Sequence, residues 1–333
     1  MANISVMGAG SWGTALAILL ARNGHPTCLW GHNPDHLAAL GDRRCNERYL
    51  PGVEFPDELS IEPRLAETVR GAEILLIAVP SHGFAPLLNA LKPGLEPMVR
   101  VAWATKGLEL ETGRLLHQVV QDVLGPALPM AVLSGPSFAG EVAAGLPTAI
   151  TVASEQVDFA RLLANLLHND RFRAYTSSDI VGVQLGGAIK NVLAIAAGVA
   201  DGLGFGANAR AALITRGLAE MMRLGLTLGG KPETLMGLSG VGDLILTCTD
   251  DQSRNRRFGL GLGRGESREA IMARIGQEIE GIPTAKIIHR LAAQHGVDMP
   301  ITAQTYGILY EGLPPAEAVR NLLLREQKSE ALT

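Results

Sequence analysis

Two lysines lie in apolar surroundings, where packing alone does not explain a charge. Lys106 directly follows the run VAWAT, which has the composition of a buried strand, and Lys190 lies within the stretch QLGGAIKN. Such a lysine must reach solvent, pair with an acid or serve a site. Desolvation and a second nearby cation both lower a lysine's pKa, which would suit Lys190 to proton transfer near neutral pH. For Lys106, a capping or solvent-exposed role is the alternative.

A second group of polar residues lies in GLSGVGDLILTC and DDQSRNRRFG. The first segment contributes Asp243, and the second contributes Ser253, Arg254 and Asn255, with two further arginines directly behind them. Guanidinium groups bind phosphate oxygens in pairs, and serine and asparagine add neutral donors. The pattern predicts a site for a small phosphorylated substrate, although three arginines in a loop are more often simply solvent-exposed.

The segment AVLSGPSFAGE places a turn after another apolar run. Gly135, Ser137 and Ala139 lie in this turn, where their N–H groups could face a ligand, whereas the simpler interpretation is a proline-containing connection. Asn191 follows Lys190 and could orient a substrate oxygen. Because ligands of parallel sheets bind at the carboxyl ends of the strands, this turn and Lys106 are expected at the same edge.

Three glycines near the N-terminus form the pattern G-x-G-x-x-G between a predicted strand at Ile4–Met7 and a predicted helix from about Trp12 to Asn23. In that setting Gly8 permits a tight turn, Gly10 lets the backbone approach a pyrophosphate, and Gly13 allows close packing of helix on strand. The pattern predicts a dinucleotide site, although glycines can also serve only a turn.

The start of the predicted helix supplies the phosphate contacts, because the backbone N–H groups of Ser11 and Trp12 would point out of its N-terminus. About 20 residues further on, NAD-specific folds usually carry an acidic residue for the ribose 2′-hydroxyl. This chain has LWGHNPDH there, with His32 in place of a carboxylate. An imidazole can donate to a 2′-phosphate, so we expect NADPH to be accepted. A surface histidine beside the adenosine is the alternative.

Strand-like and helical patterns alternate through the first half of the chain, which predicts βαβ units and a mostly parallel sheet. Asn33 followed by Pro34 is typical of a helix N-terminus. Besides Ile4–Met7, further strands are predicted at Thr27–Trp30, Ile74–Val79, Val99–Thr105, Met130–Ser134 and Ala149–Ala153. After about Thr176, helical periodicity dominates. We therefore expect an α/β protein with a Rossmann-like domain over residues 1–180 and an all-α substrate-binding domain over residues 181–333.

The composition restricts the partners and the location of the protein. A net charge of −4 and 4% aromatic residues argue against a nucleic-acid binder. Three widely separated cysteines without a C-x-x-C pair indicate a reducing compartment and no metal. No basic n-region precedes the first apolar run, and the run is broken by glycines, so we expect a cytoplasmic protein that is not embedded in a membrane.

The ordered set of motifs resembles the bacterial NAD(P)-dependent glycerol-3-phosphate dehydrogenases. The resemblance covers nearly the whole chain, and it is specific because all the segments occur in the order of that family. The segments are GAGSWGTALA, LWGHNPDH, ATKGLE, LSGPSFAGEV, GAIKNVLAIAAGVADGLGFGANARAALITRG, GLSGVGDLILTCT, SRNRRFG and EGIPTAK.

The resemblance implies an oxidoreductase that interconverts dihydroxyacetone phosphate and sn-glycerol 3-phosphate with NAD(P)H, supplies the latter for phospholipid synthesis and needs no metal. It implies Lys190 as the proton acceptor in alcohol oxidation, with Lys106 beside the reacting oxygen. Cofactor contacts are implied for Gly8, Gly10, Ser11, Trp12, Gly13, His32, Lys106, Ala139, Arg254, Ile279 and Glu280. Substrate contacts are implied for Lys106, Gly135, Ser137, Lys190, Asp243, Ser253, Arg254 and Asn255.

Two other functions compete with this interpretation. A 3-hydroxy acid dehydrogenase with a His–Glu proton relay would need a histidine near the start of the helical half, but only His289 and His295 follow residue 180. A non-catalytic NADP sensor would need the glycines but not the lysines and the arginine loop together. The sequence leaves a homodimer open.

Overall fold

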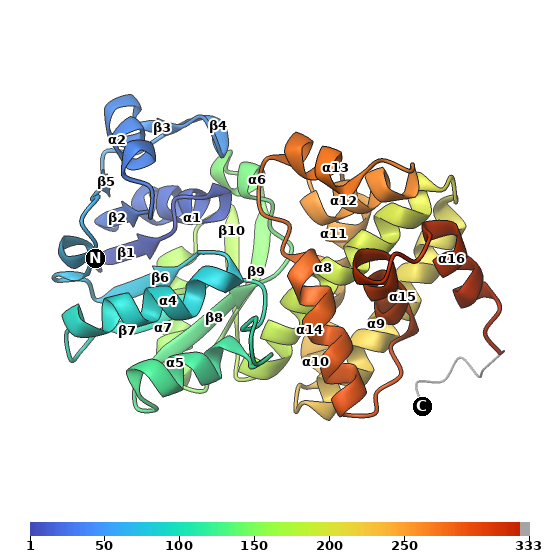
Figure 1. Ribbon diagram of the computed structural model, residues 1–333. Helices are drawn as coiled ribbons and strands as arrows, with labels where there is room; N and C mark the ends of the chain where they lie inside the picture. The colour runs from blue at the N-terminus through green and yellow to red at the C-terminus, as the bar shows by residue number, and fades with distance from the viewer. Residues whose placement is uncertain (327–333) are drawn as a thin grey trace.

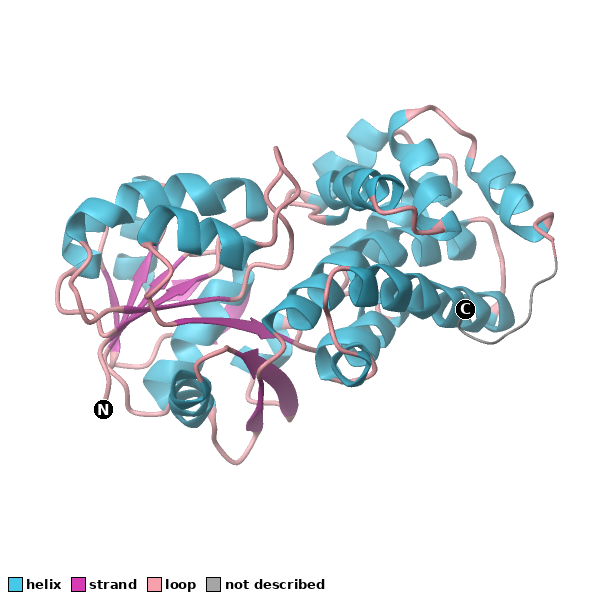
Figure 2. Cartoon of the chain, turned by 90° about the horizontal axis from the view of Figure 1, so that it is seen from below, coloured by secondary structure: helices cyan, strands magenta, loops and turns pink. Residues whose placement is uncertain are grey.

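The computed structural model describes residues 1–326, and their first half is a sheet with helices on both faces (Figures 1 and 2). Its elements are β1 (Ile4–Met7), α1 (Ser11–Arg22), β2 (Thr27–Trp30), α2 (Pro34–Arg43), β3 (Cys45–Asn46), β4 (Leu50–Glu54), β5 (Leu59–Ile61), α3 (Leu65–Val69), β6 (Ile74–Ile77), α4 (Ser81–Leu91), β7 (Arg100–Trp103), α5 (Leu116–Leu124), β8 (Met130–Ser134), α6 (Ala139–Ala143), β9 (Thr148–Ala153), α7 (Val157–Leu167) and β10 (Phe172–Ser177).

The main sheet has the strand order β10-β9-β8-β7-β6-β1-β2-β5. All neighbours are parallel except β8 and β9, so the expected mostly parallel, Rossmann-like sheet is confirmed. The chain runs outward from β1 to β2 and β5, then crosses to β6 on the other side of β1. Connections therefore leave β1 and β6 in opposite directions, which opens a crevice at their carboxyl ends.

The strands that were predicted from apolar runs are all present. β1, β2 and β8 begin and end at the predicted residues, while β6 and β7 are shorter than the runs that predicted them. The N-terminus of α2 is also as predicted, because the Asn33 side chain accepts a hydrogen bond from His36 N at 2.9 Å. The sequence did not reveal β5 and β10, which lie at the two edges of the sheet. Edge strands are half exposed and carry no continuous apolar run.

Side chains of the central strands alternate between two hydrophobic clusters. Ile4 and Val6 of β1 pack with α1 and α7, whereas Met7 packs on the opposite face with α4 and α5. β6 alternates in the same way, with Leu76 on the first face and Leu75 on the second. Successive residues of a strand point to opposite faces, so a strand buried on both faces reads as a continuous apolar run.

The second half of the described chain is helical and lies beside the sheet domain (Figure 1). Its α-helices are α8 (Ile180–Gly202), α9 (Ala207–Thr227), α10 (Pro232–Leu235), α11 (Asp243–Thr249), α12 (Arg254–Gly263), α13 (Arg268–Ile275), α14 (Gly281–Gln294), α15 (Pro300–Tyr310) and α16 (Pro315–Leu323), and a short π-helical turn spans Leu238–Gly242. A helical C-terminal domain is confirmed, and a boundary near residue 180 stays a prediction.

Helix α8 is the centre of the helical domain and contacts α9, α11, α12, α14 and α15. A Cβ atom on Gly198 would lie 2.1 Å from the carbonyl oxygen of Arg256, so the glycine is required for α12 to pack this closely. Within residues 1–326, α8 alone is long and apolar enough to cross a membrane by length and composition. It is nevertheless buried inside the domain, as the core helix of a soluble protein also would be.

Candidate active site

The two lysines singled out in the sequence meet at one aspartate between the two domains. Lys106 follows β7, and its Nζ donates to Asp243 Oδ2 at 2.7 Å and to the carbonyl oxygen of Gly135 at 3.0 Å. Lys190 lies in the middle of α8, and its Nζ donates to Asp243 Oδ1 at 2.7 Å. Each carboxylate oxygen of Asp243 therefore holds one ammonium group.

Thr247 completes this cluster and was not singled out from the sequence. It lies one turn after Asp243 on α11, and its Oγ1 accepts from Lys190 Nζ at 2.8 Å while donating to the carbonyl oxygen of Asp243 at 2.6 Å. The spacing of four residues between Asp243 and Thr247 is the sequence signal that places both on one face of a helix.

Burial and charge set the protonation states of the cluster. The side chain of Asp243 is only 1% exposed, and burial acts to raise its pKa, but the ammonium groups of Lys106 and Lys190 outweigh this and lower the pKa. Burial also lowers the pKa of Lys190 to about 8. The negative charge of Asp243 raises this pKa, whereas the positive charge of Lys106 lowers it further. A pKa in this range is compatible with proton exchange near neutral pH, and the proton-transfer role of Lys190 stays a prediction.

The glycine turn after β1 fits a dinucleotide. A Cβ on Gly8, whose φ is +130°, would lie 2.7 Å from Ala78 O, and a Cβ on Gly13 would lie 1.9 Å from Gly8 O. A Cβ on Gly10 would meet no heavy atom within 4 Å, so the backbone there is open to a ligand. Helix α1 has no side-chain cap, and the buried Trp12 Nε1 has no hydrogen-bond partner among the described residues. The open backbone at Gly10 and the uncapped start of α1 suit a pyrophosphate.

Asn46 supports this turn and was missed by the sequence reasoning. Its buried side-chain nitrogen donates to Ala9 O at 3.1 Å and to Thr14 Oγ1 at 2.8 Å, so a residue of β3 holds the glycine turn against α1. An isolated asparagine in a polar segment gives no sequence signal for such a long-range contact.

His32 is exposed in the loop between β2 and α2, and two basic residues from neighbouring segments, His36 and Arg48, lie near it. Burial lowers the pKa of the neighbouring His36, and the charges of Arg48 and His32 act in the same direction. Tyr49 joins the group, with its ring 5.2 Å from that of His36 and the Arg48 guanidinium 5.1 Å from its centre. Arg48 was not singled out from the sequence, because it lies outside the strand end that drew attention to His32.

The arginines that were expected in a loop lie in the first turn of α12, and they do not act as one basic cluster. Ser253 caps α12 by accepting from Arg256 N at 3.2 Å, and the buried Arg256 forms ion pairs with Asp201 and Asp251. Arg254 has a single hydrogen bond among the described residues, a 3.4 Å contact from its Nη1 to Gln277 Oε1. Its side chain is half-buried, and this burial lowers the pKa of the guanidinium. Asn255 Nδ2 donates to Asn191 Oδ1 at 2.9 Å and ties this helix to α8.

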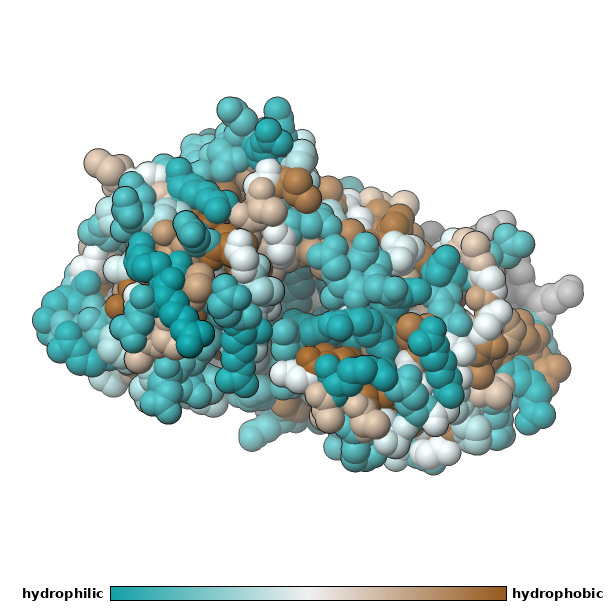
Figure 3. Space-filling view, turned by 90° about the horizontal axis from the view of Figure 1, so that it is seen from above, coloured by the Kyte–Doolittle hydropathy of each residue, from teal (hydrophilic) through white to brown (hydrophobic). Residues whose placement is uncertain are grey.

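The remaining predicted residues lie around the same junction. The Ser137 hydroxyl donates to Gly135 O at 3.0 Å, and Ala139 begins α6. Glu280 extends from the start of α14 to Ser81 in the sheet domain. The side chain of Ile279 is buried in a hydrophobic cluster of the helical domain, so only its backbone is placed to contact a ligand. Figure 3 shows a largely hydrophilic face that is hollowed where the two domains meet.

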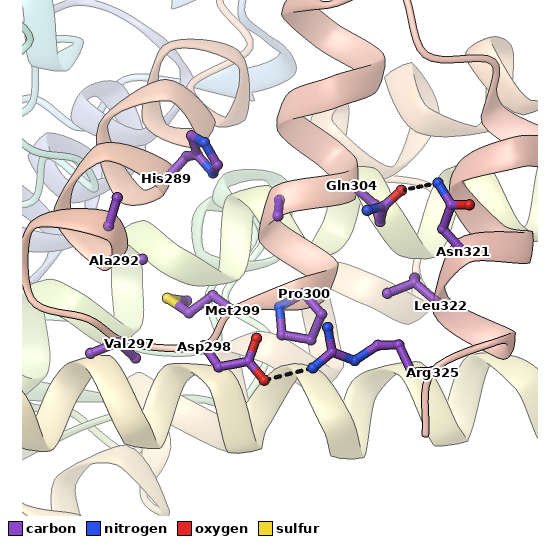
Figure 4. A pocket seen from close by; sticks show the side chains of 12 residues that line it. His289, Ala292, Val297, Asp298, Met299, Pro300, Gln304, Asn321, Leu322 and Arg325 are labelled. Carbon is purple, nitrogen blue, oxygen red and sulfur yellow. Dashed lines mark hydrogen bonds and ion pairs between the residues drawn. The ribbon is translucent and has the colours of Figure 1, made fainter. Parts of the chain in front are cut away.

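A cavity of about 260 Å³ between α14, α15 and α16 is a separate feature (Figure 4). Its polar side chains are paired, with Arg325 Nη2 2.7 Å from Asp298 Oδ2 and Asn321 Nδ2 3.1 Å from Gln304 Oε1. None of the predicted site residues lines it. We therefore place the candidate active site at the lysine–aspartate cluster.

Comparisons with known proteins agree along the whole chain. Residues 3–160 and 179–320 match the family models described as the N-terminus and the C-terminus of NAD-dependent glycerol-3-phosphate dehydrogenase. The chain is 63% identical to glycerol-3-phosphate dehydrogenase [NAD(P)+] of Methylococcus capsulatus and 59% identical to that of Aeromonas salmonicida, each over 98% of both chains.

Among solved structures, a glycerol-3-phosphate dehydrogenase from Coxiella burnetii is 50% identical, with a TM-score of 0.95 over 97% of this chain and 99% of that one. A ketopantoate reductase from Ralstonia eutropha, 19% identical with a TM-score of 0.60 over 95% of this chain and 99% of that one, shares the fold alone.

Proposed function

The chain belongs to the NAD-dependent glycerol-3-phosphate dehydrogenase family, and on that premise we propose that Lys190 transfers the proton in its reaction. The reaction is the NAD(P)-dependent interconversion of dihydroxyacetone phosphate and sn-glycerol 3-phosphate. The observation that carries the proposal is the convergence of Lys106 and Lys190 on the buried Asp243, at the carboxyl ends of the strands.

Proton transfer follows from the position of Lys190. When bound, the nicotinamide cofactor supplies a hydride to C2 of the ketone or accepts it from C2 of the alcohol. In reduction, the Lys190 ammonium donates a proton to the oxygen that becomes the C2 hydroxyl, and in oxidation the neutral amine takes that proton back. Lys106 stabilises the negative charge that develops on the oxygen, and Asp243 holds both lysines in position.

Arg254 is proposed to bind the substrate phosphate, with Ser253 and Asn255 as neutral donors. Partial burial strengthens a guanidinium–phosphate interaction because less water competes for it. The phosphate is remote from the bond that changes, so its binding energy can orient C2 beside the lysines. Gly135 and Ser137 are proposed to contact the substrate from the sheet side.

The cofactor is proposed to bind along the carboxyl edge of the sheet. The glycine turn and the N–H groups of Ser11 and Trp12 would bind the pyrophosphate, and His32 would bind a 2′-phosphate. Lys106, Ala139, Arg254, Ile279 and Glu280 are proposed as the remaining contacts. We further propose that the enzyme works in the cytoplasm and supplies glycerol 3-phosphate for phospholipid synthesis. A homodimer stays a prediction.

The test of the proton-transfer assignment is Lys190→Ala, assayed by oxidation of NADPH with dihydroxyacetone phosphate. We expect kcat to fall by about 10³-fold, within the range for loss of a general acid, while the Kd for NADPH stays nearly constant. Lys231→Ala is the matched control, because Lys231 is an exposed lysine of the same domain. Retained turnover in Lys190→Ala would overturn the assignment. Tight NADPH binding with no turnover in the unaltered protein would favour a sensor instead.

A further inference from the structure

A carboxylate of the helical domain is bound to a helix of the sheet domain. Glu280 Oε1 accepts from the backbone N–H of Ser81 at 3.1 Å, and Glu280 Oε2 accepts from the Ser81 hydroxyl at 2.8 Å. The two residues are 199 positions apart in the chain. Ser81 is only 4% exposed, so water competes little for these hydrogen bonds. The pair therefore joins the first turn of α4 to the residue that precedes α14.

The carboxylate satisfies donors that α4 cannot satisfy locally. Helix α4 begins at Ser81, and the preceding residue is Pro80, which has no side chain that can accept a hydrogen bond. The first N–H groups of a helix need an acceptor from elsewhere, and the helix dipole favours a negative charge there. Glu280 thus caps a helix of the other domain, and burial of its carboxyl, which raises its pKa, is opposed by the two bonds from Ser81.

The pair packs directly against the turn that carries Lys106. A Cβ on Gly107 would lie 2.9 Å from Ser81 Cβ and 3.4 Å from Glu280 Oε2, so any larger residue would push the pair aside. Lys106 is the preceding residue, with its ammonium group on Asp243. The position of the Ser81–Glu280 pair and the position of the lysine backbone are therefore coupled by direct contact.

A series of hydrogen bonds leads from Glu280 to the helix that carries Lys190. The backbone N–H of Gly281 donates to Asn255 Oδ1 at 2.9 Å, and Asn255 Nδ2 donates to Asn191 Oδ1 at 2.9 Å. Asn191 Nδ2 in turn lies 3.4 Å from the carbonyl oxygen of Lys106. The contacts form a closed ring through both domains, and both lysines of the cluster belong to segments that the ring holds.

We propose that Ser81 is a positioning residue of the reaction: its hydroxyl holds the Glu280 carboxylate in the orientation in which Glu280 contacts the cofactor. The inference rests on the proposed function, because Glu280 is a proposed cofactor contact. Ser81 itself touches neither the lysines nor Asp243 through any hydrogen bond among the described residues. Its effect is therefore exerted through Glu280.

The test is the kinetics of Ser81→Ala, which removes the hydroxyl and keeps the backbone donor. Without this hydrogen bond the Glu280 carboxylate is no longer held in the orientation that contacts the cofactor, so we expect the KM for NADPH to rise about tenfold, equivalent to about 1.4 kcal/mol. The KM for dihydroxyacetone phosphate and kcat should change less than about threefold, because alanine keeps the Cβ atom of Ser81 that packs against Gly107, so the turn that carries Lys106 stays in place. Ser60→Ala is the matched control, since it removes a serine hydroxyl at the sheet edge whose hydrogen bond is to Thr27 O.

A double-mutant cycle with Glu280→Ala separates positioning from a purely structural role. If Ser81 acts through Glu280, then Ser81→Ala has less than about a twofold effect on the KM for NADPH once Glu280 is alanine. An unchanged KM for NADPH in Ser81→Ala would overturn the proposal. A fall in Tm with equal increases in both KM values would also overturn it, since that is the result of a structural role.

The failure of this inference is distinguishable from the failure of the proposed function. Retained turnover in Lys190→Ala would contradict the proton-transfer assignment whatever Ser81→Ala does. If Ser81→Ala leaves the KM for NADPH unchanged while Lys190→Ala abolishes turnover, the proton-transfer assignment stands. Only the positioning role of Ser81 is then refuted.

Discussion

At the scale of single residues, the chemistry depends on two ammonium groups that share one carboxylate. Lys106 and Lys190 each lie 2.7 Å from a different oxygen of Asp243, and the cluster carries one net positive charge when both lysines are protonated. A negative charge that develops on a substrate oxygen here is attracted by that excess. The charge of Lys106 makes it easier for Lys190 to lose a proton and that of Asp243 makes it harder, so the lowered pKa of Lys190 is due chiefly to burial.

The first prediction at this scale concerns pH. Burial lowers the pKa of Lys190 to about 8, so the ammonium form declines above that pH. We expect kcat/KM for reduction of dihydroxyacetone phosphate, which reports the free enzyme, to fall about tenfold per pH unit above pH 8. Oxidation of glycerol 3-phosphate needs the neutral amine, so its kcat/KM should rise up to about pH 8 and then level off. Rate profiles in both directions measure this, and profiles without an inflection near pH 8 would contradict it.

The second prediction concerns the choice of cofactor. His32 is exposed and lies near His36, which the charge of Arg48 also reaches, so Arg48 adds a positive charge beside the loop after β2. Placing a carboxylate there with His32→Asp would repel a 2′-phosphate. We expect the ratio of kcat/KM for NADPH to that for NADH to fall about tenfold, equivalent to about 1.4 kcal/mol. His295→Asp, at an exposed histidine of the helical domain, is the control, and an unchanged ratio in His32→Asp would refute the role of His32.

At the scale of elements, helix termini are capped by residues from distant parts of the chain. Glu280 caps α4, and the buried Glu220 of α9 caps α15. Glu220 accepts from the backbone N–H of Ile301, from the N–H of Thr302 at 3.0 Å and from the Thr302 hydroxyl at 2.9 Å. Both caps connect helices that would otherwise have unsatisfied donors in the interior.

The Glu220 cap makes the stability of the protein depend on pH. Burial raises the pKa of Glu220 to about 7, above the usual value of 4.5. Between these values the folded state holds a proton that the unfolded state has lost, so the free energy of unfolding falls as pH rises from about 4.5 to 7. The loss is about 3 kcal/mol. We expect Glu220→Gln to remove this slope while still accepting a hydrogen bond.

Denaturant unfolding at pH 5 and pH 8 checks the prediction for Glu220. The unaltered protein should lose about 3 kcal/mol more than Glu220→Gln between the two pH values, because every other titrating group is common to both proteins. Parallel changes in the two proteins would show that Glu220 does not titrate in this range.

At the scale of the whole molecule, the site exists only where the two domains meet. Lys106 and Gly135 come from the sheet domain, and Lys190 and Asp243 come from the helical domain. The two domains are also joined there by the closed ring of contacts through Ser81, Glu280, Asn255 and Asn191. The kinetics of Ser81→Ala therefore test whether one interdomain hydrogen bond governs cofactor binding.

Much of the architecture could be predicted because it depends on neighbours in the sequence. β1, β2 and β8 were located to the residue, since a strand buried on both faces needs an unbroken apolar run. The glycine turn and the Asn33 cap were also evident, because each acts over a few residues. The half-exposed edge strand β10 could not be predicted, because it is defined only by its pairing with β9.

The residues with the chemistry for the site can be identified from the sequence: two lysines in apolar stretches, an aspartate, and a cluster of arginines. Their pairing, in contrast, depends on how the two domains pack. Asp243 is 137 residues from Lys106 and 53 from Lys190, and Ser81 is 199 residues from Glu280. Local preferences act over a few residues, whereas such pairs depend on how whole helices and strands pack. For that reason Thr247, Ser81 and Asn46 became visible only when the elements were placed in space.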